Sequence, residues 1–197
     1  MRHGRAAGKD SPGHCEDIMK KTLIVYHSRT GYTRRVAQAL ARRLGADLEE
    51  IRIVQPMDGV PGYVACAIEA IAGLTPALRP MRRNPADYSL VLVGTPVWFW
   101  SLSSPVRSWL EAHRTKLGRV AFFCTMGGSG AQRVFATMAA LLGRQPLATL
   151  ALADAQIDAG ADDRLDAFVR SLQAPRRAVR GAAARRGRAS MHAAAAA

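Results

Sequence analysis

A chain of 197 residues, of which 49% are hydrophobic, is long enough to form one domain with a sizeable core. Its formal net charge of +13 favours anionic partners or membrane surfaces in general and indicates no specific binding of nucleic acid. No apolar run reaches the length of about eighteen residues that a membrane span needs, so no transmembrane helix is expected. The first residues also lack the apolar stretch of a secretory signal.

The three cysteines stand far apart and form no C-x-x-C pair, and the five histidines show no metal-binding spacing. We therefore expect free thiols in a reducing cytoplasm and no metal site. Cys66 and Cys124 lie in apolar stretches, where burial as packing residues is expected.

The chain begins with residues 1–20, which are polar and mixed in charge and are expected to form a disordered extension. An apolar strand is predicted over 22–27, and a helix over 32–44 follows after a short turn. Val36 and Leu40 lie four residues apart in this helix, as in the buried stripe of an amphipathic helix.

The next part of the chain is less regular. A second strand, predicted over 47–53, mixes apolar residues with acids, which suits an outer strand of a sheet. Residues 54–86 contain loops rich in proline and glycine, with one short amphipathic helix between Val64 and Ile71.

From residue 89 onward, strands and helices alternate. Further strands are predicted over 89–93, 119–124 and 147–152. Further helices are predicted from Ser103-Ser104-Pro105, where a hydroxyl N-cap precedes proline, and over 131–143 and 162–173. This alternation is typical of an α/β fold in which helices cover both faces of a parallel sheet.

Beyond Gln173 the composition changes, because Ala, Arg and Gly dominate and no apolar periodicity is visible. Residues 174–197 are therefore predicted to be a disordered basic tail. Such an arm is suited to peripheral contact with acidic lipid or nucleic acid, although a solvated low-complexity end is the simpler interpretation.

The turn after the first strand has the composition of an anion site. Ser28, Thr30 and Thr33 carry hydroxyl groups, and Gly31 lets the backbone come close to a ligand. The first amides of the following helix lack intrahelical partners and lie at the positive end of its dipole, so a phosphate suits this place. The glycine-rich nucleotide fingerprints G-x-G-x-x-G and G-x-x-x-x-G-K-[ST] do not begin here.

Ser28-Arg29-Thr30-Gly31-Tyr32-Thr33 resembles the T/S-x-T-G-x-T phosphate loop of the flavodoxin family, which holds the phosphate of FMN. Residues 87–98 and 119–130 are similar to two strands of that family, each with the flavin-flanking loop that follows it. The resemblance covers residues 21–173. It implies a flavodoxin-like, doubly wound, five-stranded parallel sheet of order 2-1-3-4-5, with the ligand crevice between strands one and three.

The resemblance also implies that FMN is the cofactor and that three loops hold it. In the first loop, the expected phosphate ligands are the hydroxyl groups of Ser28, Thr30 and Thr33 and the backbone amides of Gly31 and Tyr32. Arg29 either adds positive charge there or is solvated.

The second loop is expected to flank the flavin ring with an aromatic side chain. Its residues are Thr95, Pro96, Val97, Trp98, Phe99 and Trp100. Trp98, which follows Thr-Pro-Val directly, is the first candidate for this role, and Trp100 and Phe99 are alternatives. At least one of the three aromatic side chains is expected to pack beneath the loop, and Phe99 is the candidate for that position.

The third loop is expected to bond the pyrimidine end of the flavin. Its residues are Thr125, Met126, Gly127, Gly128 and Gly130. Long flavodoxins place a stacking tyrosine in this region, and this sequence has none. We therefore expect one flavin face to be open, which would admit a quinone or a nicotinamide, or to be covered by Met126. A plain glycine-rich helix cap is the structural alternative.

No carboxylate pair, Ser-His-Asp set or Cys-His pair stands at these strand ends, so no catalytic residue is expected, and the cofactor would carry the electrons. For His27, which adjoins the first loop, we expect a structural role in preference to a role as a proton relay. Residues 21–173 carry 18 basic and 12 acidic side chains, whereas well-known flavodoxins are usually acidic.

The sequence thus predicts an FMN-binding protein of electron transfer, with a redox partner protein, a quinone or NAD(P)H as its partner. One alternative is an FMN-dependent NAD(P)H or quinone reductase, or a protoporphyrinogen-oxidase-like enzyme. The other is a flavodoxin-fold module that binds no flavin.

Overall fold

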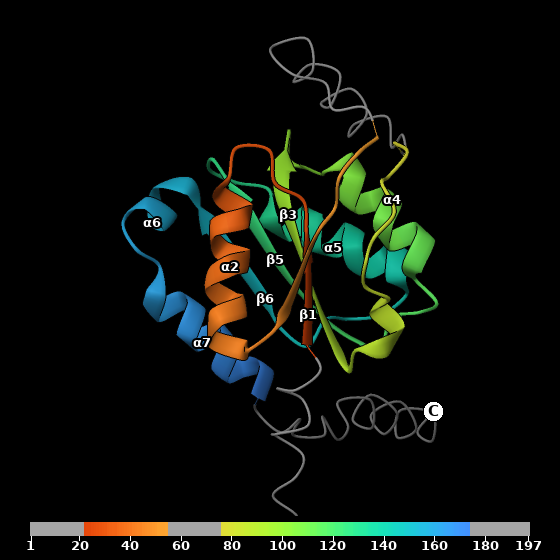
Figure 1. Cartoon of the computed structure of the whole chain (residues 1–197). Helices are drawn as coiled ribbons and strands as arrows, with labels where there is room; N and C mark the ends of the chain where they lie inside the picture. Colours follow the sequence, from red (N-terminus) through yellow and green to blue (C-terminus); the bar gives the residue numbers. More distant parts are fainter. Residues whose placement is uncertain (1–21, 55–75, 174–197) are drawn as a thin grey trace, which may run out of the picture.

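A sheet of five parallel strands forms the centre of the computed structural model, which describes residues 22–54 and 76–173 (Figure 1). The strands are β1 (Thr22–Tyr26), β2 (Asp47–Glu50), β3 (Leu90–Trp98), β5 (Arg119–Met126) and β6 (Thr149–Ala153). They lie in the order β2-β1-β3-β5-β6, and each pairs in parallel with its neighbours. Counted along the chain, this is the predicted order 2-1-3-4-5, and the predicted fold class is confirmed.

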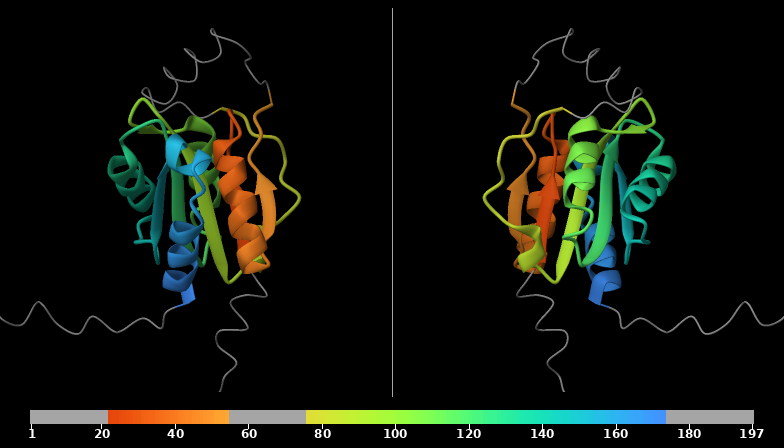
Figure 2. Two further views of the ribbon diagram at one scale, coloured as in Figure 1. Left: turned by 90° about the vertical axis from the view of Figure 1, so that its left-hand side faces the viewer. Right: turned by 90° about the vertical axis from the view of Figure 1, so that its right-hand side faces the viewer.

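Helices cover both faces of the sheet, as Figure 2 shows from two opposite sides. One face carries α2 (Tyr32–Leu44), α6 (Asp154–Asp158) and α7 (Asp162–Gln173). The other face carries α4 (Ser104–His113) and α5 (Ala131–Leu142), and a single 3₁₀ turn, η1 (Pro85–Asp87), precedes β3. The five-residue helix α6 was not predicted, because it is too short to show an apolar period.

Alternate residues of the inner strands enter two separate cores. Ile24 of β1 packs on the α2 face, whereas Leu23 and Val25 pack on the α4 face. This two-sided burial explains why the inner strands read as continuous apolar runs. Complete burial of a Leu, Ile or Val side chain contributes roughly 1.5–3 kcal/mol, so the buried residues of these strands contribute strongly to the stability of the fold.

The end of β3 differs from the prediction. The strand does not stop at residue 93 but continues to Trp98. Residues 94–96 pair in parallel with β5, and Val97 and Trp98 pair antiparallel with β4 (Ser101–Leu102), which turns back along the strand. Phe99 and Trp100 form the two-residue turn between them. Neither residue is a usual turn former, so the sequence carried no signal for this hairpin. The second strand is also shorter than predicted, since β2 ends at Glu50.

Cys124 is a free thiol buried at the end of β5, and burial raises its pKa to about 12. It is therefore a protonated packing residue, as expected. None of the helices in the described part of the chain combines the length and hydropathy needed to cross a bilayer. The expected extension 1–20, the helix containing Cys66 and the tail 174–197 lie outside the described residues.

Candidate functional site

Three loops follow neighbouring strands at the carboxyl edge of the sheet. The first loop (27–31) follows β1, the hairpin loop (96–102) includes the end of β3 and β4, and the third loop (127–130) follows β5. Since β3 lies between β1 and β5, the loops meet where the winding direction of the sheet reverses. This is the edge at which the predicted site residues were expected to converge.

The first loop delivers the chain into α2 through Gly31. This residue is the N-cap of α2 and has a φ of 95°, which favours glycine. The Arg34 amide donates to the Ser28 hydroxyl oxygen at 3.2 Å, so the Ser28 proton remains available to an acceptor. Thr30 is exposed at the tip of the loop. The opening amides of α2 thus face the edge of the sheet next to two hydroxyl groups, as an anion site requires.

A buried hydrogen bond joins the elements beside the first and third loops. The hydroxyl oxygens of Thr33 and Thr125 lie 2.8 Å apart, and both residues are almost completely buried. The bond links the first turn of α2 to the end of β5. It therefore holds two predicted cofactor loops in one position, although the two threonines are 92 residues apart in sequence.

The hairpin loop exposes a different pair of aromatic residues from the one expected. Trp98 is buried, with 9% of its surface exposed, and meets the His27 ring edge-on at a centroid distance of 5.6 Å. Phe99 and Trp100 are 43% and 59% exposed. The expectation that Phe99 packs beneath the loop is wrong, because the two-residue turn directs it outward and Trp98 occupies the buried position.

Trp100 connects the hairpin loop to the third loop. Its indole Nε1–H donates to the Ser129 hydroxyl oxygen at 2.8 Å. Gly130 has a φ of 109°, and a Cβ atom there would stand 3.0 Å from the Cα of Trp100 and from Cγ1 of Val97. Glycine is thus required where the two loops touch. Ser129 was not among the predicted site residues, although it lies inside the predicted third loop.

Thr95 is completely buried, and its hydroxyl group pairs with that of Ser103 at 2.9 Å. Ser103 is the N-cap of α4, one residue before the serine that directly precedes Pro105, and its side chain bonds Thr95 and not the helix amides. The remaining predicted residues are at least partly exposed, namely Ser28, Arg29, Gly31, Tyr32, Pro96, Val97, Met126, Gly127, Gly128 and Gly130.

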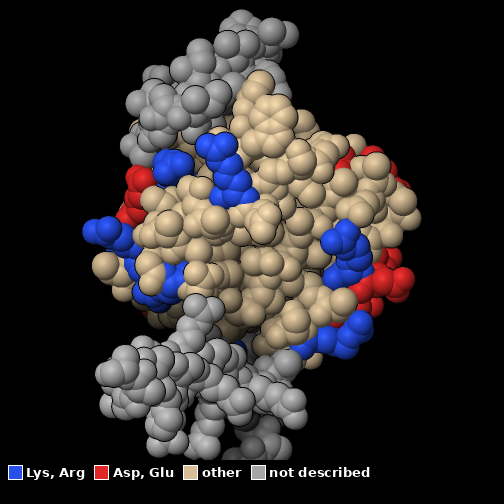
Figure 3. All heavy atoms as spheres, turned by 180° about the vertical axis from the view of Figure 1, so that it is seen from behind, with Lys and Arg blue, Asp and Glu red and all other residues tan. Residues whose placement is uncertain are grey.

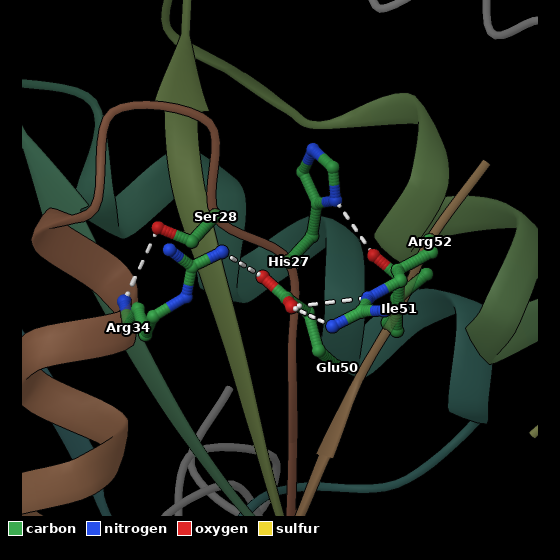
Figure 4. A network of polar contacts seen from close by, with 6 residues as sticks. All are labelled: His27, Ser28, Arg34, Glu50, Ile51 and Arg52. Atoms are coloured by element: carbon green, nitrogen blue, oxygen red, sulfur yellow. Dashed lines mark hydrogen bonds and ion pairs between the residues drawn. The ribbon is translucent and has the colours of Figure 1, made fainter. Parts of the chain in front are cut away.

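Charged side chains flank the first loop on the side of β2. Figure 4 shows Glu50 between Arg34 and Arg52, with ion pairs of 2.6 and 3.1 Å. Glu50 was not predicted to belong to the site, because only the pairing of β2 with β1 places it beside this loop. Figure 3, seen from behind the view of Figure 1, shows a broad uncharged area with basic and acidic side chains at its margins.

His27 is fixed in one tautomer at the base of the first loop. Its Nδ1 lies 2.9 Å from the carbonyl oxygen of Ile51, an acceptor, so Nδ1 carries the proton (Figure 4). Burial lowers the pKa of His27 below its ordinary value, although the Ile51 carbonyl and Glu50 oppose this effect. The imidazole is thus held neutral between β2 and Trp98.

The site geometry fits a phosphorylated aromatic cofactor. A Cβ atom at Gly31, Gly127 or Gly128 would meet nothing within 4 Å, so the backbone at these positions is open to a ligand. The exposed indole of Trp100 stands beside the third loop and offers a surface for a flat ring. From the sequence, the phosphate was expected at the first loop and the ring beside Trp98, with Trp100 as an alternative.

Comparison with known proteins agrees with this fold. The sequence model of a flavodoxin family, described as "Flavodoxin", matches residues 21–147. The chain belongs to the flavodoxin family.

Flavodoxin-like structures superpose on most of the chain. A flavoprotein from Lactobacillus acidophilus NCFM, solved in complex with FMN, is 23% identical, covers 72% of this chain and 98% of its own, and has a TM-score of 0.59. A putative flavoprotein from Bacteroides eggerthii DSM 20697 is 24% identical, covers 76% of this chain and 98% of its own, and has a TM-score of 0.62. At these identities the likeness establishes the fold. A search of curated proteins finds no match.

Proposed function

We propose that this flavodoxin-family protein binds FMN at the three loops and serves in electron transfer. The observation that carries the proposal is the convergence of the loops, held together by the Thr33–Thr125 and Trp100–Ser129 hydrogen bonds. Membership of the flavodoxin family and the likeness to an FMN-bound flavoprotein support the choice of cofactor. The protein would act in the cytoplasm, with a redox partner protein, a quinone or NAD(P)H as its partner.

The phosphate and the ring of FMN would be bound by different groups of the protein, at two ends of the site. Ser28, Thr30 and the opening amides of α2 would receive the phosphate, with Gly31 allowing its close approach. We assign the ring face to Trp100 in preference to Trp98, because Trp98 is buried against His27. When bound, FMN supplies the one- or two-electron chemistry, and the protein supplies position and charge.

The direct test is a titration of the flavin-free protein with FMN and with riboflavin, which lacks the phosphate. We expect FMN to bind with quenched fluorescence and a shifted visible spectrum. Thr30→Ala should weaken FMN binding by about tenfold, the effect of losing one charge-assisted hydrogen bond, and should leave riboflavin binding unchanged. Thr115→Ala, an exposed threonine in the turn after α4, serves as the matched control. A colourless protein that takes up no FMN would instead select the flavin-free module.

A second candidate is an FMN-dependent oxidoreductase acting on NAD(P)H and a quinone. The open third loop favours it, because Gly127 and Gly128 are exposed and the loop contains no tyrosine to cover a ring. Steady oxidation of NAD(P)H by the FMN-loaded protein with a quinone, and without any added reductase, would select this activity. Reduction only by a separate reductase would select the electron carrier.

A further inference from the structure

A cavity lies along β2, the outer strand of the sheet, on the side of the first loop that Glu50 and Arg52 flank. It has a volume of about 390 Å³, and we name it the outer-edge pocket. Its lining residues are Tyr26, Leu48, Glu49, Glu50, Arg52, Arg79, Pro80 and Arg82. Three chain segments form it, because residues 79–82 run beside β2 and its continuation, and the end of β1 contributes Tyr26.

The pairing of these segments sets two arginines side by side. Ile53 and Leu78 form an antiparallel bridge, and the Arg79 amide donates to the Arg52 carbonyl oxygen at 2.8 Å. In this register Arg52 stands directly opposite Arg79, so both side chains lie on the same face. Like charges in directly opposed positions destabilise a strand pair, and an anion between them would relieve the repulsion.

The carboxylates of the outer-edge pocket already have arginine partners. Glu50, with 14% of its side chain exposed, is paired with both Arg34 and Arg52 (Figure 4). Glu49 lies 4.0 Å from Arg83 and also accepts the backbone amide of Arg82 at 3.3 Å.

The side chains of Arg79 and Arg82 remain available to a ligand. Across residues 22–54 and 76–173, neither guanidinium has a carboxylate within 4.0 Å. Among the described residues, the pocket therefore presents two guanidinium groups without a carboxylate partner. A third guanidinium, that of Arg52, is paired with Glu50, which Arg34 also contacts.

We propose that the outer-edge pocket binds a phosphate-bearing anion through Arg79, Arg82 and Arg52. Planar guanidinium groups bind phosphate oxygens with paired, charge-assisted hydrogen bonds, and Pro80 and Leu48 would line the less polar part of a ligand. The phosphate could belong to a nucleotide or to inorganic polyphosphate. This site goes beyond the proposed function and does not depend on bound flavin.

Calorimetric titration of the full chain saturated with FMN tests the proposal. The probes are inorganic pyrophosphate and adenosine 2′,5′-bisphosphate, with adenosine as the uncharged comparison. We expect the Kd of a phosphate probe to rise at least about tenfold in Arg79→Ala/Arg82→Ala, because two charged donors are lost. Arg114→Ala/Arg170→Ala removes the same charge from two exposed positions elsewhere and should leave the Kd within about twofold. The single variant Arg82→Ala replaces the double variant if the latter does not fold.

The outcomes separate the ligand sources and the two proposals. Binding of the bisphosphate alone indicates a nucleotide phosphate, and binding of both probes indicates phosphate groups in general. If FMN does not bind, a phosphate probe could occupy the first loop instead. In that case Thr30→Ala would weaken binding of the probe, and the Arg79 and Arg82 substitutions would not. Absence of binding at millimolar probe concentration, or binding that is insensitive to Arg79 and Arg82, overturns the outer-edge pocket as a phosphate site.

Discussion

Single residues set how closely the loops and strands approach one another. Gly94 shows this most directly, because a Cβ atom there would lie 2.1 Å from the Phe123 ring on the neighbouring strand. The Phe123 side chain is completely buried and cannot move aside without opening the core on the α2 face. Because Gly94 has no side chain, the Phe123 ring can lie against it while β3 and β5 stay paired.

We predict that Gly94→Ala destabilises the protein by about 1–3 kcal/mol, the usual cost of overpacking a core. Gly118→Ala is the matched control, since a Cβ atom there would meet only carbonyl oxygens, at 3.7 and 3.8 Å. Urea unfolding of both variants gives the comparison. Equal stability of the two variants would contradict the packing role assigned to Gly94.

A second prediction at this scale concerns acid sensitivity. Because burial lowers the pKa of His27 below its ordinary 6.5, the unfolded chain takes up a proton below pH 6.5 while the folded protein does not. The contribution of His27 to the free energy of unfolding is therefore complete above pH 6.5 and is lost as the pH falls toward the folded-state pKa.

The free energy of unfolding should decrease more between pH 7.5 and 5.5 in the wild type than in His27→Asn. The asparagine amide retains a donor for the Ile51 carbonyl oxygen but does not titrate. Other titrating groups are common to both proteins, so the difference in slope isolates His27. Identical slopes would mean that His27 has the same pKa in the folded and unfolded chains.

At the scale of elements, the turn of the hairpin formed by β3 and β4 contains two residues with a strained backbone conformation. Phe99 and Trp100 have φ values of 47° and 56°, a region that bulky side chains avoid. The hairpin retains this turn while exposing both aromatic side chains beside the third loop. Such strain is maintained where a site needs a particular side chain in a particular place.

We predict that Phe99→Asn is more stable than Phe99→Ala by about 0.5–1 kcal/mol, because asparagine adopts positive φ more readily. Both substitutions remove the same aromatic ring, so their difference reports the backbone preference. Thermal unfolding of the two variants provides the measurement. The opposite order of stability would show that the turn relaxes out of the left-handed region when Phe99 is removed.

At the scale of the whole molecule, charge distinguishes this protein from acidic flavodoxins. Residues 21–173 carry 18 basic and 12 acidic side chains, and Arg34 and Arg52 lie beside the first loop. Since fully reduced FMN is anionic near neutral pH, a positive environment should stabilise it. We therefore predict a less negative midpoint potential for the final reduction step than acidic flavodoxins have.

Redox titration at two salt concentrations tests this prediction with an acidic flavodoxin as the control. Raising the ionic strength from about 0.1 to 1 M shortens the screening length from roughly 10 to 3 Å. The potential should then become more negative in this protein and less negative in the acidic flavodoxin. A potential as low as that of the acidic protein at low salt would refute the prediction.

The amino-acid sequence alone determined the alternation of strands and helices, the strand order and the position of the first loop. The alternation and the first loop follow from local patterns, since apolar periodicity and a turn rich in glycine and hydroxyl groups are set by neighbouring residues. The strand order was expected from the resemblance to the flavodoxin family. The flavodoxin family could be recognised because three such turns occur in the right order.

Only the tertiary structure decided which side chains meet. It buried Trp98 and exposed Phe99, joined Thr33 to Thr125, and set Arg52 opposite Arg79. The positions of Trp98 and Phe99 depend on the turn between β3 and β4, whereas the other two contacts depend on the pairing of segments distant in the chain. A shift of one residue in a strand pairing would reverse the face on which each side chain lies. Neither the turn at Phe99 and Trp100 nor the pairing of Ile53 with Leu78 has a recognisable sequence pattern, so these parts of the site are known only from the folded structure.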